Sequence, residues 1–274
     1  MNLTNTATIK SLLAKHGLRP NKVMGQHFLV SESALAKIVK AARLDNTDVV
    51  LEVGPGLGVL TQELVKHAGR VIAIEKDLKL IEVLADVIPA KAGIQIVHGD
   101  ILKLDPADYG LGALGYKIVA DIPYYLTSRL FRQFLESPHQ PSCMILLVQK
   151  EVAERIGAKP PKATLLSNAV QYYADVVMVG KVPKSAFYPP PKVDSEIINL
   201  VVKRKYDAIF DNIFFKLLKV GFSAPRKQVF GNISKIHGKE NATKWLYKAG
   251  IAPSARPQTI TLDQWIALVA ASSK

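Results

Sequence analysis

The stretch LEVGPGLGVLT, residues 51–61, decides how this chain folds. Gly54, Gly56 and Gly58 follow a short apolar run and precede a segment with apolar residues at helical spacing. Glycines in this arrangement predict a tight turn from a buried strand into a helix, where a ligand can approach the main chain closely. The spacing G-x-G-x-G is one residue shorter than the dinucleotide fingerprint G-x-G-x-x-G. Glu52, just before the turn, places a carboxyl group at the same point of the chain.

Short apolar runs alternate with helical segments between residues 48 and 149. The pattern predicts strands at 49–53, 70–75, 94–98, 117–121 and 143–148, with helices at 57–68 and 78–88. Such alternation predicts an α/β fold with a parallel, Rossmann-like sheet and helices on both faces. Ligands bind to these sheets beyond the carboxyl ends of the strands, so the residues that follow each strand are the candidate functional residues.

The chain of 274 residues has a formal net charge of +13, and most of the excess lies near the C-terminus. From Lys203 onward, 13 Lys and Arg residues stand against four Asp and Glu residues. Helical patterns at 210–222, 240–250 and 262–271 predict a small, basic, all-α domain at residues 205–274, after a larger domain at residues 1–204. A basic appendage of this kind indicates a polyanionic partner, most often nucleic acid.

The cysteine content and the N-terminal sequence exclude several classes of protein. Cys143 is the single cysteine, which excludes an intramolecular disulfide framework and a multi-cysteine zinc site. The N-terminal residues lack the apolar stretch of a signal peptide, and no apolar run approaches membrane-spanning length. We therefore expect a cytoplasmic protein that uses no metal and no membrane segment.

Acidic residues follow three more of the predicted strands. Glu75 ends the second strand, about 20 residues after the glycine turn, where a carboxylate can accept both hydroxyl groups of a ribose. Asp100 follows the third strand and can accept a hydrogen bond from an adenine amine, although an Asp also commonly opens a turn. The fourth strand ends in Asp121, Ile122, Pro123 and Tyr124. This tetrapeptide is also typical of an ordinary strand end that is stopped by proline.

The conjunction of these strand ends resembles the class I S-adenosylmethionine-dependent methyltransferases. More narrowly, the chain is similar to the ribosomal RNA adenine N6,N6-dimethyltransferases, the bacterial small-subunit (16S) enzymes in particular. The resemblance covers nearly the whole chain beyond the first 20 residues. The matching stretches are GQHFL (25–29), LEVGPGLGVLT (51–61), Glu75, HGD (98–100), IPYYLTS (122–128), VQKEVAERI (148–156), FYPPPKVDS (187–195) and GFSAPRK (221–227).

The resemblance implies S-adenosylmethionine as the cofactor and a position for it across the strand ends. It implies that residues from five segments bind the cofactor. These residues are His27, Leu29, Gly54, Gly56, Glu75, Asp100 and Asp121. GQHFL is expected to fold over the cofactor, with His27 and Leu29 at the contact positions. The family usually has Asn where this chain has His27.

The resemblance also implies how the target base is held. The Asp121 side chain and the backbone carbonyl of Ile122, before Pro123, would accept hydrogen bonds from adenine N6, which is a poor nucleophile while its lone pair is delocalised into the ring. Tyr124 would stack on one face of the flipped base and Phe187 would cover the other. Small-subunit enzymes usually have Asn where this chain has Asp121, and an ionised carboxylate is a stronger acceptor than an amide but donates nothing.

The resemblance implies that the partner is small-subunit ribosomal RNA within an immature small ribosomal subunit. It also implies that the protein acts as a monomer. We expect contacts to phosphate from Lys203, Arg204, Arg226 and Lys227. Such contacts supply affinity but little readout of the RNA sequence.

Three other functions are compatible with parts of the pattern. The related large-subunit dimethyltransferases that confer macrolide resistance share the basic helical domain and FYPPPKVDS, whereas VQKEVAERI favours the small-subunit type. A non-catalytic RNA-binding factor on the same scaffold would also carry these motifs. A nicotinamide-dependent dehydrogenase is disfavoured by the G-x-G-x-G spacing and by the Asp-x-Pro-Tyr strand end.

Overall fold

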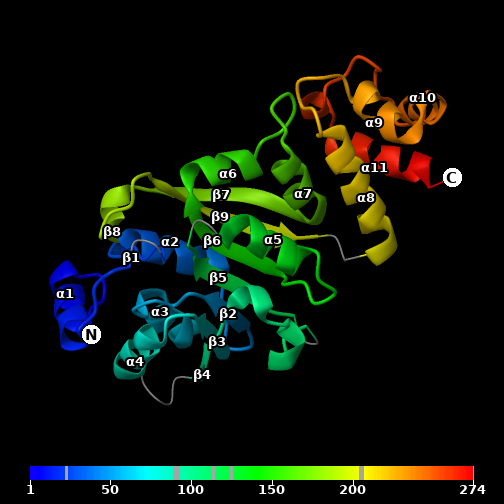
Figure 1. Cartoon of the computed structure of the whole chain (residues 1–274). Helices are drawn as coiled ribbons and strands as arrows, with labels where there is room; N and C mark the ends of the chain where they lie inside the picture. Colours follow the sequence, from blue (N-terminus) through cyan, green and yellow to red (C-terminus); the bar gives the residue numbers. More distant parts are fainter. Residues whose placement is uncertain (22–23, 89–92, 113–114, 124–125, 204–206, 274) are drawn as a thin grey trace. The chain divides into compact units, whose positions relative to one another are not determined.

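The computed structural model describes residues 1–21, 24–88, 93–112, 115–123, 126–203 and 207–273, and Figure 1 shows how their helices and strands are arranged within each part of the chain. The strands are β1 (Phe28–Leu29), β2 (Val49–Val53), β3 (Arg70–Glu75), β4 (Ile94–His98), β5 (Lys117–Asp121), β6 (Cys143–Gln149), β7 (Ala174–Val182), β8 (Phe187–Tyr188) and β9 (Ser195–Val202). The α-helices are α1 (Thr6–Lys15), α2 (Glu32–Ala42), α3 (Val59–His67), α4 (Leu78–Val87), α5 (Thr127–Leu135), α6 (Lys150–Ile156), α7 (Leu165–Tyr173), α8 (Ala208–Gly221), α9 (Val229–His237), α10 (Lys239–Lys248) and α11 (Leu262–Ser272). Short 3-10 helices include η1 (Ile101–Lys103) and η2 (Pro106–Tyr109).

Seven strands form one sheet in the order β4-β3-β2-β5-β6-β9-β7. Strands β4, β3, β2, β5 and β6 run parallel to one another, and β9 runs antiparallel to β6. The five strands β2 to β6 that the sequence predicts are confirmed, as is the α/β class. Because the parallel strands point the same way, β2, β3, β4 and β5 end at the same edge of the sheet.

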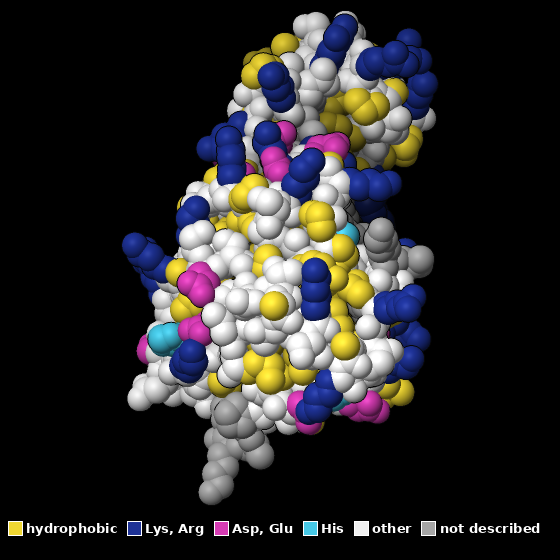
Figure 2. Space-filling view, turned by 90° about the vertical axis from the view of Figure 1, so that its left-hand side faces the viewer, with side chains coloured by type: hydrophobic (Ala, Val, Ile, Leu, Met, Phe, Trp, Pro, Cys, Tyr) yellow, Lys and Arg dark blue, Asp and Glu magenta, His cyan; other side chains and the backbone are white. Residues whose placement is uncertain are grey.

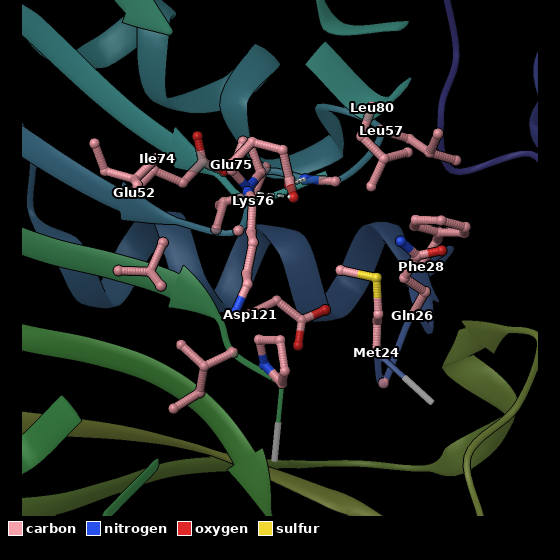
Figure 3. Close-up of a pocket in the computed structure, with 18 of the residues that line it drawn as sticks. Met24, Gln26, Phe28, Glu52, Leu57, Ile74, Glu75, Lys76, Leu80 and Asp121 are labelled. Carbon is pink, nitrogen blue, oxygen red and sulfur yellow. Dashed lines mark hydrogen bonds between the residues drawn. The ribbon is translucent and has the colours of Figure 1, made fainter. Parts of the chain in front are cut away.

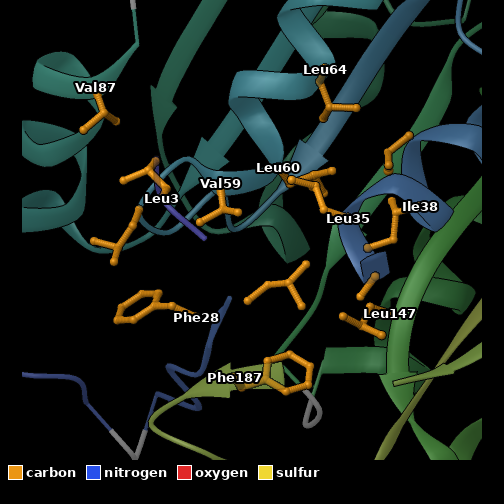
Figure 4. Packing of buried hydrophobic residues seen from close by; sticks show 14 of the residues in the cluster. Leu3, Phe28, Leu35, Ile38, Val59, Leu60, Leu64, Val87, Leu147 and Phe187 are labelled. Atoms are coloured by element: carbon orange, nitrogen blue, oxygen red, sulfur yellow. The ribbon is translucent and has the colours of Figure 1, made fainter. Parts of the chain in front are cut away.

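The helices α2, α3 and α4 pack on one face of the sheet around a continuous hydrophobic core (Figure 4). Alternate residues of the strands, such as Val50 and Val119, enter this core together with Ile38 of α2 and Leu64 of α3. The opposite face is covered by α5, whose Gln133 side chain donates hydrogen bonds to backbone carbonyls at both ends of η1. Helices on both faces are the arrangement that the sequence predicts.

The chain divides into two compact units. The sheet unit contains residues 1–153 and 175–203, and the helical unit contains residues 154–174 and 204–274. The sequence placed residues 154–174 with the sheet, in a domain of residues 1–204. In the structure they pack with the C-terminal helices, because α7 contacts α8 and α11.

A buried carboxyl group holds α7 to α8 inside the helical unit. Asp211 on α8 is 3% exposed and accepts hydrogen bonds from the hydroxyl groups of Tyr172 (2.5 Å) and Tyr173 (2.6 Å). In the same unit, Thr261 and Gln264 form the capping box at the start of α11 that their spacing predicts. Helix α9 was not predicted from the sequence.

Candidate functional site

The ends of β2, β3, β4 and β5 form the floor of a pocket of about 1140 Å³, measured with its open mouth (Figure 3). Its wall is completed by residues 24–29 and by Phe187. The residues that line it include all seven expected cofactor residues, which are His27, Leu29, Gly54, Gly56, Glu75, Asp100 and Asp121. Ile122 and Pro123 line it too. The pocket therefore brings together segments that are about 160 residues apart in the chain.

The glycine turn after β2 takes the backbone conformation that its sequence predicts. Gly54, Gly56 and Gly58 all have positive φ angles, of 66°, 60° and 85°. A Cβ atom on Gly56 would lie 3.5 Å from the Phe28 ring, at the pocket wall. A Cβ atom on Gly58 would lie 3.1 Å from the Leu84 side chain, so this glycine lets α3 pack closely against α4. The turn therefore needs glycine for its conformation and for its close approaches.

Glu75 is a buried carboxyl group at the end of β3, next to the glycine turn. It is 6% exposed and accepts hydrogen bonds from the backbone N–H groups of Gly56 (3.1 Å), Lys76 (2.8 Å) and Asp77 (2.9 Å). Burial raises the pKa of Glu75, and these three donors oppose that rise. The turn and the β3 carboxyl group are thus bonded to each other.

Asp100, after β4, has two roles inside the protein. Its Oδ1 accepts a hydrogen bond from Leu102 N at the start of η1, so the turn-opening role of this Asp is present. Its Oδ2 pairs with Lys76 Nζ at 2.9 Å, which lowers the pKa of Asp100 below its usual value. Lys76 was not singled out in the sequence, where it reads only as a neighbour of Glu75. Adjacent parallel strands place the residues that follow their ends side by side. Once β3 and β4 were predicted as neighbours, the ion pair between Lys76 and Asp100 could have been predicted too.

Asp121 lies at the end of β5 and its side chain faces the pocket (Figure 3). Burial raises the pKa of Asp121 from 3.8 to about 8, and no described group donates a hydrogen bond that would oppose this rise. Ile122 and Pro123 follow it along the pocket floor. Tyr124, the expected stacking residue, lies outside the described residues.

Glu52 adds a third carboxyl group with a raised pKa to the pocket, after Glu75 and Asp121. It is 1% exposed, and burial raises its pKa to about 8, with a further contribution from the charge of Glu75. The buried Thr61 hydroxyl group lies beside Glu52 and lowers its pKa, in opposition to burial. Glu52 Oε2 nevertheless has no hydrogen-bond partner of standard geometry among the described residues. Glu52 therefore presents an unpartnered oxygen in a pocket that already holds three more carboxyl groups, those of Glu75, Asp100 and Asp121.

A two-residue pairing brings GQHFL to the FYPPPK segment. Phe28 and Leu29 of β1 pair with Tyr188 and Phe187 of β8 in antiparallel register. His27 Nδ1 lies 2.7 Å from the Pro189 backbone oxygen, so the ring is held at the pocket wall. Phe187 is 4% exposed and packs in the hydrophobic core as well as lining the pocket.

The candidate RNA-binding residues lie outside this pocket. Arg226 and Lys227 are exposed in the turn between α8 and α9. Lys203 follows β9 and forms an ion pair with Asp175. Arg204 lies outside the described residues. The helical unit carries 15 Lys and Arg residues against five Asp and Glu residues, and Figure 2 shows Lys and Arg side chains over its surface at the top of the view.

The described part of the chain contains neither a membrane-spanning helix nor a metal-binding cluster of side chains. No helix there is long and apolar enough to cross a membrane. No group of three or more His, Cys, Asp or Glu side chains there is arranged to hold a metal ion.

The pocket fits S-adenosylmethionine on observations of its own. Its glycine turn leaves the main chain open to close approach, and its unpartnered Glu52 oxygen and raised carboxyl pKa values suit a ligand that carries positive charge. A seven-stranded sheet in which β9 runs antiparallel to β6, a glycine turn after β2 and a carboxyl group at the end of β3 define a class I methyltransferase. Proteins of this class take methyl groups from S-adenosylmethionine.

Comparison with known proteins identifies the family within that class. Residues 17–274 match the family described as "Ribosomal RNA adenine dimethylase". The chain belongs to this family, which excludes the dehydrogenase alternative. It is therefore an S-adenosylmethionine-dependent methyltransferase of ribosomal RNA adenine.

Individual relatives support the assignment. The chain is 42% identical over 263 residues to the "Ribosomal RNA small subunit methyltransferase A" of Dehalococcoides mccartyi, which covers 94% of this chain and 90% of that protein. It is 39% identical to the protein of the same name from Enterococcus faecalis, over 97% and 94% of the two chains. A dimethyladenosine transferase from Plasmodium falciparum has a similar structure, with a TM-score of 0.73 at 26% identity over 88% of this chain and 96% of that one. The 23S rRNA methyltransferase ErmE shares the fold, with a TM-score of 0.74 at 24% identity over 90% and 100% of the chains.

Proposed function

We propose that this protein dimethylates N6 of two adjacent adenosines in the 3′-terminal hairpin loop of small-subunit ribosomal RNA, giving N6,N6-dimethyladenosine. The names of its bacterial relatives support the small subunit as the substrate, and the family supports adenine as the base. In this proposal the protein acts as a monomer in the cytoplasm, on small subunits that are still maturing. The observation that carries the proposal is the convergence of Asp121, Ile122 and the expected cofactor residues on one pocket.

The cofactor is held by the strand ends in this proposal. Glu75 holds the ribose, Asp100 faces the adenine amine, and the turn at Gly54 and Gly56 passes beneath the methionine part. His27 and Leu29 close the pocket from the side of β1. When bound, S-adenosylmethionine supplies an electrophilic methyl group on a positively charged sulfur, so no metal is needed and positioning supplies much of the acceleration.

The target adenine is held by Asp121 and by the residues after it. The Asp121 carboxyl group and the Ile122 carbonyl oxygen accept hydrogen bonds from N6, which favours a pyramidal nitrogen with its lone pair free to react. Phe187 lines one side of the pocket, and Tyr124 is the residue that we expect to stack on the base. A base bound in this way must leave its own stack, as in other enzymes that modify bases.

The helical unit supplies affinity for the RNA. Arg226 and Lys227, with Lys203 and Arg204, contact phosphates in this proposal, and the net positive charge of the unit attracts the ribosomal particle. Sequence choice comes from unpaired bases in the loop rather than from these contacts.

The test is nucleoside analysis of under-methylated small ribosomal subunits after incubation with the protein and S-adenosylmethionine. We expect N6,N6-dimethyladenosine in the small subunit and none in purified large subunits treated in the same way. An Asp121→Ala variant, checked for an unchanged melting curve, should lose the product.

Each contrary result identifies a different alternative. Product in the large subunit alone would support the macrolide-resistance type of enzyme. RNA binding without methyl transfer would support a non-catalytic factor. Near-normal turnover by the Asp121→Ala variant would refute the role of that carboxyl group.

A further inference from the structure

Residues 24–29 form the wall that closes the cofactor pocket opposite the strand ends, and we call them the wall segment. All six line the pocket. Its C-terminal end is fixed by the pairing of β1 with β8 and by the contact between His27 and Pro189. What holds its other end, beside α4, decides whether the pocket is open or closed on the cofactor side.

Gln26 holds that end through both groups of its side-chain amide. Its Oε1 accepts a hydrogen bond from Asn21 N at 2.8 Å, and its Nε2 donates one to Asp77 Oδ2 at 3.0 Å. The Gln26 backbone N–H also donates to the Asn21 carbonyl at 3.1 Å. The amide has one orientation here, because a rotated amide would place Nε2 against the N–H of Asn21.

Asp77 is itself fixed on both sides. Its Oδ1 accepts a hydrogen bond from Lys79 N at 3.1 Å, as the N-cap of α4. Its backbone N–H donates to Glu75 Oε1, the carboxyl group that lies in the pocket. A continuous chain of hydrogen bonds therefore runs from the wall segment, through Asp77, to the carboxyl group at the end of β3.

We propose that the Gln26–Asp77 hydrogen bond is a latch that holds the wall segment across the bound cofactor. Gln26 is then a positioning residue, which sets how long the cofactor stays bound and touches none of the reacting atoms. The inference rests on the proposed function, since it takes S-adenosylmethionine to be the occupant of the pocket. It concerns a residue of GQHFL other than the expected contact positions His27 and Leu29.

The test exchanges the donor and the acceptor of the latch. Gln26→Glu leaves two carboxyl groups facing each other, and Asp77→Asn leaves two amide donors facing each other. The double variant Gln26→Glu/Asp77→Asn restores every bond, because the new Asn donates to the new Glu while its own Oδ1 still caps α4. The double variant also has the same net charge as the wild type.

We expect each single variant to release S-adenosylmethionine about tenfold faster than the wild type, as for the loss of one hydrogen bond to a charged group. The double variant should return to within about threefold of the wild-type rate, given imperfect geometry of the exchanged pair. Release is measured by dilution and stopped flow, and affinity by calorimetry, on the full chain without RNA. In methyl-transfer assays, the KM for the cofactor should rise by more than kcat falls.

A Gln26→Ala variant guards against misfolding, since it removes the latch without adding a charge. It should match the single variants in cofactor release while its melting curve stays close to that of the wild type. Unchanged release in the single variants, or a double variant as fast as the singles, would overturn the latch and leave the proposed function intact. Failure of the wild type to bind S-adenosylmethionine would overturn the proposed function, and the latch with it.

Discussion

The raised pKa of Asp121 makes methyl transfer depend on pH in a way that one substitution should remove. Burial moves the pKa of this carboxyl group from 3.8 to about 8. The shift corresponds to a preference of about 6 kcal/mol for the neutral form relative to a carboxyl group in water. At pH 7 about a tenth of the free enzyme then has an ionised Asp121, and at pH 9 about nine-tenths does.

The ionised form is the better acceptor for the hydrogens of adenine N6. We therefore expect kcat/KM for RNA, measured at limiting cofactor, to rise about tenfold between pH 7 and pH 9 in the wild type. An Asp121→Asn variant keeps a side-chain oxygen in place but has no group that titrates, and its profile should lack this rise. Cofactor, RNA and Glu52 titrate equally in both proteins, so the ratio of the two rates isolates Asp121.

The assay is transfer of labelled methyl groups to under-methylated small subunits, in single turnovers at constant ionic strength. At saturating cofactor the midpoint of the wild-type profile should lie at lower pH, because a nearby positive charge favours the ionised carboxyl group. Parallel profiles for the wild type and the Asn variant would refute the reasoning, whatever their absolute rates.

Three further predictions follow from the fold and the charge distribution. Burial raises the pKa of Glu52 to about 8, so its contribution to stability is fully present below pH 4.5 and is lost as pH rises through 8. In urea titrations, Glu52→Gln should therefore reduce the loss of unfolding free energy between pH 6 and pH 9 by about 2–3 kcal/mol. An unchanged loss would contradict the burial of this carboxyl group. Gly58→Ala should lower the unfolding free energy by about 1–3 kcal/mol in the same measurement, because its Cβ would press on α4 from a backbone conformation with positive φ. An unchanged unfolding free energy would show that the side chains of α4 move aside. Replacing both Arg226 and Lys227 with alanine should reduce the slope of log binding constant against log salt concentration by the equivalent of about two phosphate contacts. A slope equal to that of the wild type, measured by filter binding, would exclude these residues from the RNA interface.

The sheet and most of the pocket could be predicted from the sequence because both depend on local patterns. Strands β2 to β5 are short apolar runs between amphipathic helices, and their bounds agree with those predicted. Since parallel strands end at a common edge, Glu75, Asp100 and Asp121 had to lie near one another once the strands were known. The glycine turn then fixed which edge carries the ligand.

Other features depend on contacts that no local pattern reveals. Strands β1 and β8 have two residues each, and their pairing joins segments about 160 residues apart. Two residues are too few to show the alternation that predicts a strand. Segment 154–174 joins the helical unit through the buried Asp211, whose tyrosine partners belong to α7. Only the resemblance to a family predicted that the GQHFL and FYPPPK segments lie at the same pocket.

The pocket concentrates carboxyl groups in a way that favours one kind of ligand. The charge of Glu75 adds to burial in raising the pKa of Glu52, and burial raises the pKa of Asp121. Without a ligand these groups are a source of instability that rises with pH. A ligand with a positively charged sulfur and a positively charged amine removes that cost on binding, whereas the same ligand without its sulfonium charge removes less of it.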